Sequence, residues 1–296
     1  MASILQESSA LVTHKGWNEI LEEESETVVA LIYLIILATL ALVIASRSHD
    51  PKLLYQMTRE DGVVEWLTVI ALVFLSLFLL RGIKQLSTEV PKSWKLSAGL
   101  LSFLSLLAAG EEISWGQRIF NFEVSQQFRD LNYQNETNLH NLLPGELFNG
   151  VITFGVAIGF VLVPITWRKI KGKVPWLFPS HELSLLMLCI ILVNHYRVSG
   201  LGEKGGIVLL LFLLLASSLQ ALKQRHGRHL AACSLAWLNF TTLFLYRDIL
   251  RAANHQYEIR ELLIIIAVTK FCSELLENLE KRYPRTRENP STESSA

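Results

Sequence analysis

The chain has 296 residues, of which 51% are apolar and 18% are charged, and its 27 Lys and Arg balance 27 Asp and Glu. The balanced charge provides no basic face for nucleic acid, which excludes a nucleic-acid-binding role. A mean hydropathy of +0.34, with several apolar runs near the roughly 20 residues that cross a bilayer, predicts an all-α polytopic membrane protein.

Eight apolar segments predict about eight transmembrane helices in a single domain over residues 29–278. The preceding residues 1–28 are polar and acidic, so we expect a cytoplasmic segment and no signal peptide. Residues 279–296 are too polar to pack and are expected to form a disordered cytoplasmic tail. The helices are expected at residues 29–46, 62–81, 96–113, 149–167, 181–198, 206–222, 230–249 and 259–277.

The distribution of basic residues predicts the orientation in the membrane. With the N-terminus in the cytoplasm, sixteen Lys and Arg lie on the cytoplasmic side and eight on the opposite side. The excess favours both termini inside, in a cell inner membrane. The loop over residues 118–149 then lies on the outer side, where most of the unusual polar residues also lie.

The stretch from 108 to 141 carries two adjacent acids, Glu111 and Glu112, at the end of an apolar helix. Neighbouring residues on a helix point about 100° apart, so only one of the two needs to face the interior. An acid at this depth is expensive to leave ionised, and this favours a general base, a proton carrier or a metal ligand. The alternative is an interfacial salt bridge between one of these acids and Arg118.

Two residues that follow the acids are candidates for binding a substrate. Trp115 and Gln117 come directly after the paired glutamates. The indole of Trp115 could equally anchor the helix end at the membrane interface, because tryptophan prefers that layer.

Residues Glu136 and His140 are four apart, which puts them on one face if the segment is helical. A carboxylate and an imidazole make half of a Zn²⁺ or Fe²⁺ site, and His140 is also a candidate catalytic residue. We expect His195, at the outer end of another helix beside Asn194, as a further ligand. The alternative is a capped, hydrogen-bonded loop with no metal.

Four polar residues near the seventh predicted helix share one helical face if that helix continues. They are Arg247, Arg251, His255 and Glu258. Two arginines one turn apart can grip a phosphate or carboxylate with paired hydrogen bonds. The alternative is a set of salt bridges to Glu65 and to one of the paired glutamates, since each buried carboxylate needs a partner.

The sequence EEISWGQRIF, followed by NETNLHN, resembles uncharacterised bacterial polytopic membrane proteins with an E-E-x-S-W-G-Q-R signature. That resemblance implies a bacterial inner-membrane setting and no activity. The paired glutamates also resemble the E-E-x-x-x-R motif of CAAX-type (CPBP) intramembrane proteases, which implies a glutamate-activated water. Here Gly116 occupies the position of the motif arginine, Arg118 lies two residues further on, and Glu136 precedes His140 where that family has Phe.

These features predict an intramembrane hydrolase or transferase that acts on a membrane lipid or a small amphiphile at the outer leaflet. Glu111 or Glu112 would be the general base, with a divalent metal as a possible cofactor. A proton-coupled transporter or flippase, and a non-catalytic membrane partner protein, are the alternatives. The substrate, the metal and the oligomeric state stay open. Supporting roles are expected for Glu65, Arg118, Asn194, His255 and Glu258.

Overall fold

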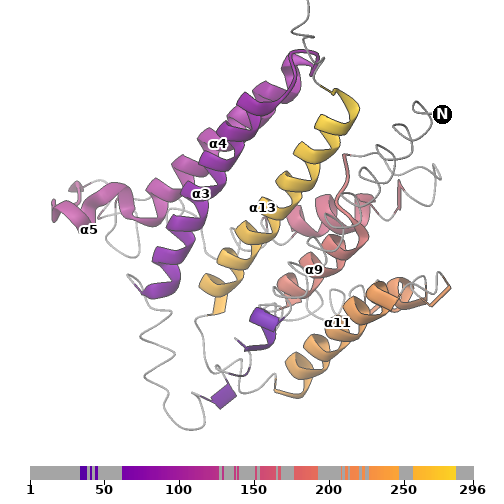
Figure 1. The fold of residues 1–296 in the computed structure, drawn as a ribbon. Helices are drawn as coiled ribbons and strands as arrows, with labels where there is room; N and C mark the ends of the chain where they lie inside the picture. Colours follow the sequence, from indigo (N-terminus) through magenta and orange to yellow (C-terminus); the bar gives the residue numbers. More distant parts are fainter. Residues whose placement is uncertain are drawn as a thin grey trace, which may run out of the picture. The chain divides into compact units, whose positions relative to one another are not determined.

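The structure is a computed structural model (Figure 1) in which every regular element of the described residues is a helix, and this confirms the all-α class. Described helical residues occur within each of the eight segments in which the sequence predicts a helix. The described residues are 34–38, 41, 44–45, 62–126, 129, 137, 139, 151, 154–164, 166–167, 177–192, 208, 211–212, 214–219, 222–223, 227–246 and 256–284.

The chain packs as two compact units, each built from segments that are distant in the sequence. The first unit comprises Met1–Tyr55 and Ser180–Tyr257, and the second comprises Gln56–Pro179 and Glu258–Ala296. The candidate functional residues that the structure describes lie in the second unit.

The second unit is built on a hairpin of two long helices, α3 (Val63–Gln85) and α4 (Lys92–Glu112). Buried hydroxyls join them: the Oγ atoms of Ser76 and Ser102 lie 2.8 Å apart, and the Ser102 hydroxyl is 3.1 Å from the Ser76 carbonyl oxygen. Small residues at this crossing allow the two backbones to approach closely, as they do between membrane helices. Helix α4 begins at Lys92, immediately after Pro91 and four residues before the predicted start.

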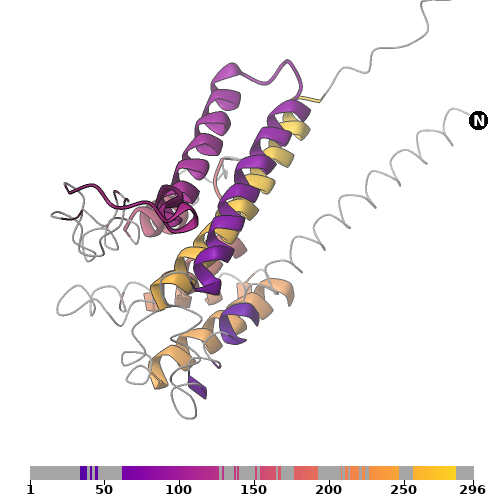
Figure 2. The same cartoon turned by 90° about the vertical axis from the view of Figure 1, so that its left-hand side faces the viewer.

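Helix α13 (Gln256–Arg282) runs along α3, as Figures 1 and 2 both show. One cluster joins Leu75 and Leu79 of α3 to Cys272 of α13. A second joins the residues after α3 to Leu279. Helix α13 extends beyond the predicted 259–277 at both ends, because its terminal turns are amphipathic and the hydropathy pattern marks only its apolar centre.

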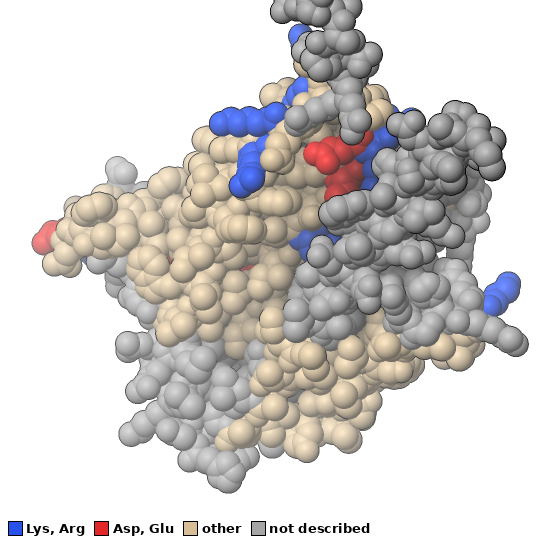
Figure 3. Space-filling view, viewed as in Figure 1, with Lys and Arg blue, Asp and Glu red and all other residues tan. Residues whose placement is uncertain are grey.

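Helices α3 and α4 expose large apolar side chains along their length. Ile70, Phe74 and Leu77 of α3 are 61%, 58% and 59% exposed, and Leu96 of α4 is 75% exposed. Both helices are also long and apolar enough to cross a membrane. A water-soluble surface rarely exposes so continuous an apolar face, so these helices indicate association with a membrane. Figure 3 shows a broad uncharged surface below the blue side chains at the top.

A π-helix, η3 (Ala157–Leu162), packs against the middle of α13 in the same unit. The rings of Phe160 and Phe271 meet edge to face, with centroids 5.2 Å apart. Such edge-to-face pairs stabilise a contact between helices beyond the area they bury.

The first unit contains α9 (His181–Leu192) and α11 (Gly227–Leu245), which pack against each other. The backbone nitrogen of Leu183 donates to the Ser180 hydroxyl at 3.2 Å, so Ser180 caps α9. The indole of Trp237 donates to Ser218 at 2.9 Å and fastens α11 to the segment around 214–219.

Candidate functional site

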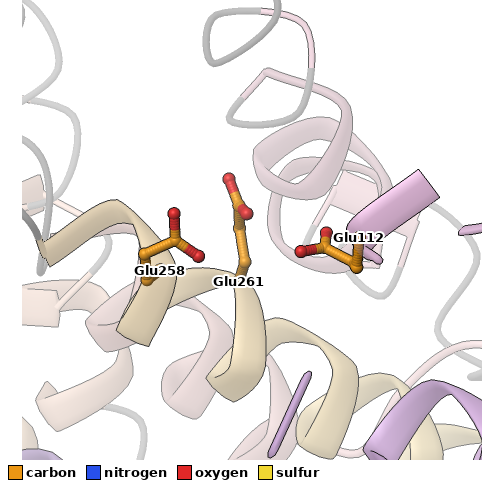
Figure 4. A group of neighbouring side chains, drawn as sticks. All are labelled: Glu112, Glu258 and Glu261. Atoms are coloured by element: carbon orange, nitrogen blue, oxygen red, sulfur yellow. The ribbon is translucent and has the colours of Figure 1, made fainter. Parts of the chain in front are cut away.

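Three glutamates converge where α4 ends and α13 begins. Glu112 is the last residue of α4, whereas Glu258 and Glu261 lie in the first turns of α13. Their spacing of three residues puts both α13 acids on the same side of the helix. One carboxylate oxygen from each residue lies within 4.8 Å of the other two (Figure 4). We refer to Glu112, Glu258 and Glu261 as the glutamate cluster.

The glutamate cluster is partly shielded from solvent. Glu258 is buried, and Glu112 and Glu261 are half-buried. The buried Arg260 lies beside the cluster, with its Nη2 atom 3.4 Å from Oε1 of Glu261.

The chemistry of the cluster follows from its donor atoms. The donors that the described residues provide are carboxylate oxygens, which suit Mg²⁺, Ca²⁺ or Mn²⁺. Two oxygens on opposite sides of a Ca²⁺ ion are about 4.6–5.2 Å apart, since each bond is about 2.3–2.6 Å long. The observed limit of 4.8 Å therefore allows all three acids to reach one ion.

Glu111 makes a different set of contacts from its neighbour. Its Oε1 atom accepts a hydrogen bond from the indole nitrogen of Trp115 at 2.6 Å, and its Oε2 atom accepts one from the backbone nitrogen of Leu139 at 2.6 Å. The two adjacent acids therefore divide as the helical geometry predicts. Glu112 faces Glu258 and Glu261. Glu111 joins the end of α4 to Leu139, 28 residues further along the chain.

A left-handed turn follows α4 and brings Trp115 back to Glu111. Ser114, Trp115 and Gly116 have φ angles of 47°, 55° and 81°, in the short helix η1 (Ser114–Gly116). Left-handed conformations are unfavourable for residues with a Cβ atom, so surrounding contacts must hold the first two in place. Gly110 provides the space: a Cβ atom there would lie 3.0 Å from Cζ3 of Trp115.

Gln117 completes the attachment of the following loop. It is the first residue of α5 (Gln117–Phe120), and its Oε1 atom accepts hydrogen bonds from both the backbone nitrogen and the hydroxyl of Thr137, each at 2.8 Å. Glu111 and Gln117 together hold Leu139 and Thr137 against the end of α4. The contacts of Gln117 and Trp115 are thus internal to the protein.

The remaining predicted site residues differ in what the structure describes. Glu65 lies in the first turn of α3 and is half-buried. The backbone of Arg118 lies in α5, and its side chain is outside the described part of the structure. Seven further predicted residues lie outside the described residues, and their roles stay predictions: Glu136, His140, Asn194, His195, Arg247, Arg251 and His255.

Sequence reasoning did not nominate Glu261 as a site residue, although a signal was present. Glu258 and Glu261 are three apart, which places both on one face of any helix that includes them. The sequence puts Glu258 on one face with Arg247 and Arg251 only if the seventh helix continues, whereas the structure places Glu258 in α13. Because both residues belong to α13, the carboxylate of Glu261 lies beside that of Glu258.

Comparison with protein families, curated proteins and solved structures finds no match to this chain. The class of the protein therefore follows from its fold and from its candidate site. Its described residues form an all-α fold that includes two membrane-length apolar helices and a cluster of three glutamates at one end of them.

Proposed function

We propose that this chain is a polytopic inner-membrane hydrolase or transferase that acts on a lipid or small amphiphile through a divalent cation held by the glutamate cluster. The observation that carries the proposal is the convergence of three carboxylates within 4.8 Å at the end of a membrane-length helix. The eight-helix arrangement and the cytoplasmic termini are part of the same proposal and rest on the sequence.

The charges of the described residues favour a cation. Three ionised carboxylates so close together repel one another, and partial burial increases the cost. Arg260 compensates for one negative charge beside Glu261.

A bound divalent ion would polarise a carbonyl or phosphoryl group and activate water, which is the chemistry of metal-dependent hydrolysis and group transfer. Within that site Glu258 and Glu261 are expected to hold the ion from α13. Glu112 is the member of the cluster that α4 contributes. It could also accept a proton from the attacking water.

The exposed residues that follow α4 support an amphiphilic substrate. Trp115, Ile119 and Phe120 lie within eight residues of Glu112 in the sequence and are 45%, 52% and 77% exposed. The apolar faces of α3 and α4 continue from this end. A molecule with a polar head and an apolar tail could therefore place its head near the glutamates and its tail against these side chains.

The alternatives use the same residues differently. In a proton-coupled transporter or flippase the acids would carry protons, and in a non-catalytic partner they would only hold the helices together.

An assay with fluorescent phospholipids and added Mg²⁺, Mn²⁺ or Ca²⁺ tests the proposal on the purified full chain in detergent. We expect metal-dependent product release that Glu112→Gln or Glu261→Gln abolishes.

The exposed Glu123 provides a matched control, because Glu123→Gln removes one carboxylate from the same region without touching the cluster. Its activity should equal that of the wild type. Proton uptake by reconstituted vesicles without product release would instead favour transport. Equal activity in all three variants would contradict a role of the cluster in catalysis.

A further inference from the structure

The opposite end of the second unit gathers basic residues from three helices. The end of α3, the start of α4 and the end of α13 meet around a small apolar cluster of Leu86, Val90 and Leu279, with Trp94 and Tyr283 packed against it. Figure 3 shows blue side chains at the top, where Figure 1 has the α3–α4 turn and the end of α13. We call the following residues the basic collar: Arg81, Lys84, Lys92, Lys95, Lys281 and Arg282.

The basic collar has few acids to balance it. All of its members are exposed except the half-buried Lys95. No ion pair within the described residues involves Arg81, Lys84, Lys92, Lys95 or Lys281. The nearby acids in these helix ends and in the turn are Glu89, Glu277 and Glu280, so three carboxylates face six cations.

Helix dipoles explain only part of the basic collar. Lys84, Lys281 and Arg282 lie in the last turns of α3 and α13, where a cation is favourable. Lys92 and Lys95 lie in the first turn of α4, which contains no acid. Positive charge at a helix N-terminus interacts unfavourably with the helix dipole. A bound anion from outside the described residues would offset the charge of these two lysines.

The depth of the basic collar identifies the source of that anion. The 23 residues of α3 span about 34 Å, which is slightly more than the roughly 30 Å hydrocarbon core of a bilayer. Cations at the end of such a helix lie at the level of the lipid headgroups. Trp94 and Tyr283 are residues that favour this layer, and the exposed apolar faces of α3 and α4 lead directly into it.

We propose that the basic collar binds the headgroups of anionic phospholipids in one leaflet, with Lys92 and Lys95 as its main contacts. The proposal depends on the membrane insertion of α3 and α4 and not on the chemistry of the glutamate cluster. The basic collar would thus prefer anionic lipids, in addition to the effect of its basic residues on the orientation of the helices in the membrane.

Retention of lipid by the purified full chain tests the proposal. The protein is delipidated, equilibrated with equal parts of phosphatidylcholine and phosphatidylglycerol in detergent at low salt, and its retained lipids are measured by mass spectrometry. We expect the wild type to be enriched in phosphatidylglycerol. Each lysine removed in Lys92→Gln and Lys95→Gln should lower the enrichment by about fivefold, as is typical of a cation near an anionic surface.

Matched variants separate charge from packing. Lys92→Arg with Lys95→Arg retains the charge and should retain the enrichment, and Glu112→Gln should not alter it. If the glutamine variant does not fold, high salt applied to the wild type removes the same attraction. Equal retention of both lipids by the wild type would overturn the proposal. So would enrichment that survives the loss of both lysines or high salt, or displacement of the lipid by soluble glycerol phosphate.

Discussion

The Oε2 atom of Glu111 accepts a hydrogen bond of 2.6 Å from the backbone nitrogen of Leu139, whereas the neighbouring Glu112 faces Glu258 and Glu261 of α13. Two adjacent acids therefore have different partners. Substitution of Glu111 should therefore affect stability, whereas substitution of Glu112 should affect the chemistry of the glutamate cluster.

Glu111→Ala should destabilise the protein with little direct effect on the glutamate cluster. It removes the acceptors for Trp115 and Leu139, and hydrogen bonds to a charged group each contribute about 1.5–3 kcal/mol when shielded and less when exposed. We expect a loss of about 1–2 kcal/mol, measured as a lower melting temperature in detergent. An unchanged melting temperature would show that these contacts do not hold Leu139 against the end of α4.

Glycine at position 110 should be required for the indole of Trp115 to occupy its place. Gly110→Ala puts a methyl group 3.0 Å from that ring, so the ring must shift and the left-handed turn should weaken. Gly99→Ala is the matched control on the same helix, because nothing lies within 4 Å of its Cβ position. Alanine at 99 should stabilise α4 by up to about 1 kcal/mol through helix propensity.

Thermal unfolding of the two glycine variants checks this expectation. Gly99→Ala should melt at or above the wild-type temperature and Gly110→Ala below that of Gly99→Ala. Equal melting temperatures for the two variants would contradict a tight contact between Gly110 and Trp115.

The hydroxyls of Ser76 and Ser102 should couple α3 to α4. Both side chains are buried, so either single alanine variant leaves a buried polar atom without its partner. The double variant removes both groups and should cost less than the sum of the single changes. We expect a coupling free energy of about 1 kcal/mol from a double-mutant cycle. Strictly additive effects would show that the hydrogen bond contributes nothing to the pairing of the helices.

Reporter fusions test the orientation on which the membrane proposal depends. A cytoplasmic reporter at Ala296 and a periplasmic reporter within residues 121–135 should both be active, because sixteen basic residues lie on the expected inner side and eight on the outer. A periplasmic signal from the fusion at Ala296 would contradict a cytoplasmic C-terminus.

Much of the fold could be predicted because long apolar runs and helix caps leave clear patterns. The α3 and α4 helices follow from their apolar length, and Ser180 caps α9 as its position before an apolar run predicts. The ends of α13 could not be predicted from hydropathy, since Lys281, Arg282 and the first turn of the helix are polar. The π-helix at Ala157–Leu162 has no signature in its composition.

The candidate site could be predicted only in part. Helical geometry requires Glu111 and Glu112 to diverge, but it does not determine which one faces inward. The contact of Trp115 with Glu111 uses a left-handed turn at Ser114 and Trp115, two residue types that rarely adopt positive φ angles. The partnership of Glu112 with Glu258 and Glu261 depends on how α13 packs along α3, which no local pattern reveals.

Titration of the purified protein with Mg²⁺, Mn²⁺ and Ca²⁺ in an isothermal calorimeter tests the central claim most directly. The account predicts saturable binding of one divalent ion to the wild type and to Glu123→Gln. It predicts binding at least tenfold weaker in Glu112→Gln and in Glu261→Gln, because each variant removes one charged ligand while keeping the size of the side chain. Absence of saturable binding, or equal affinity in all four proteins, would contradict the assignment of a cation to Glu112, Glu258 and Glu261.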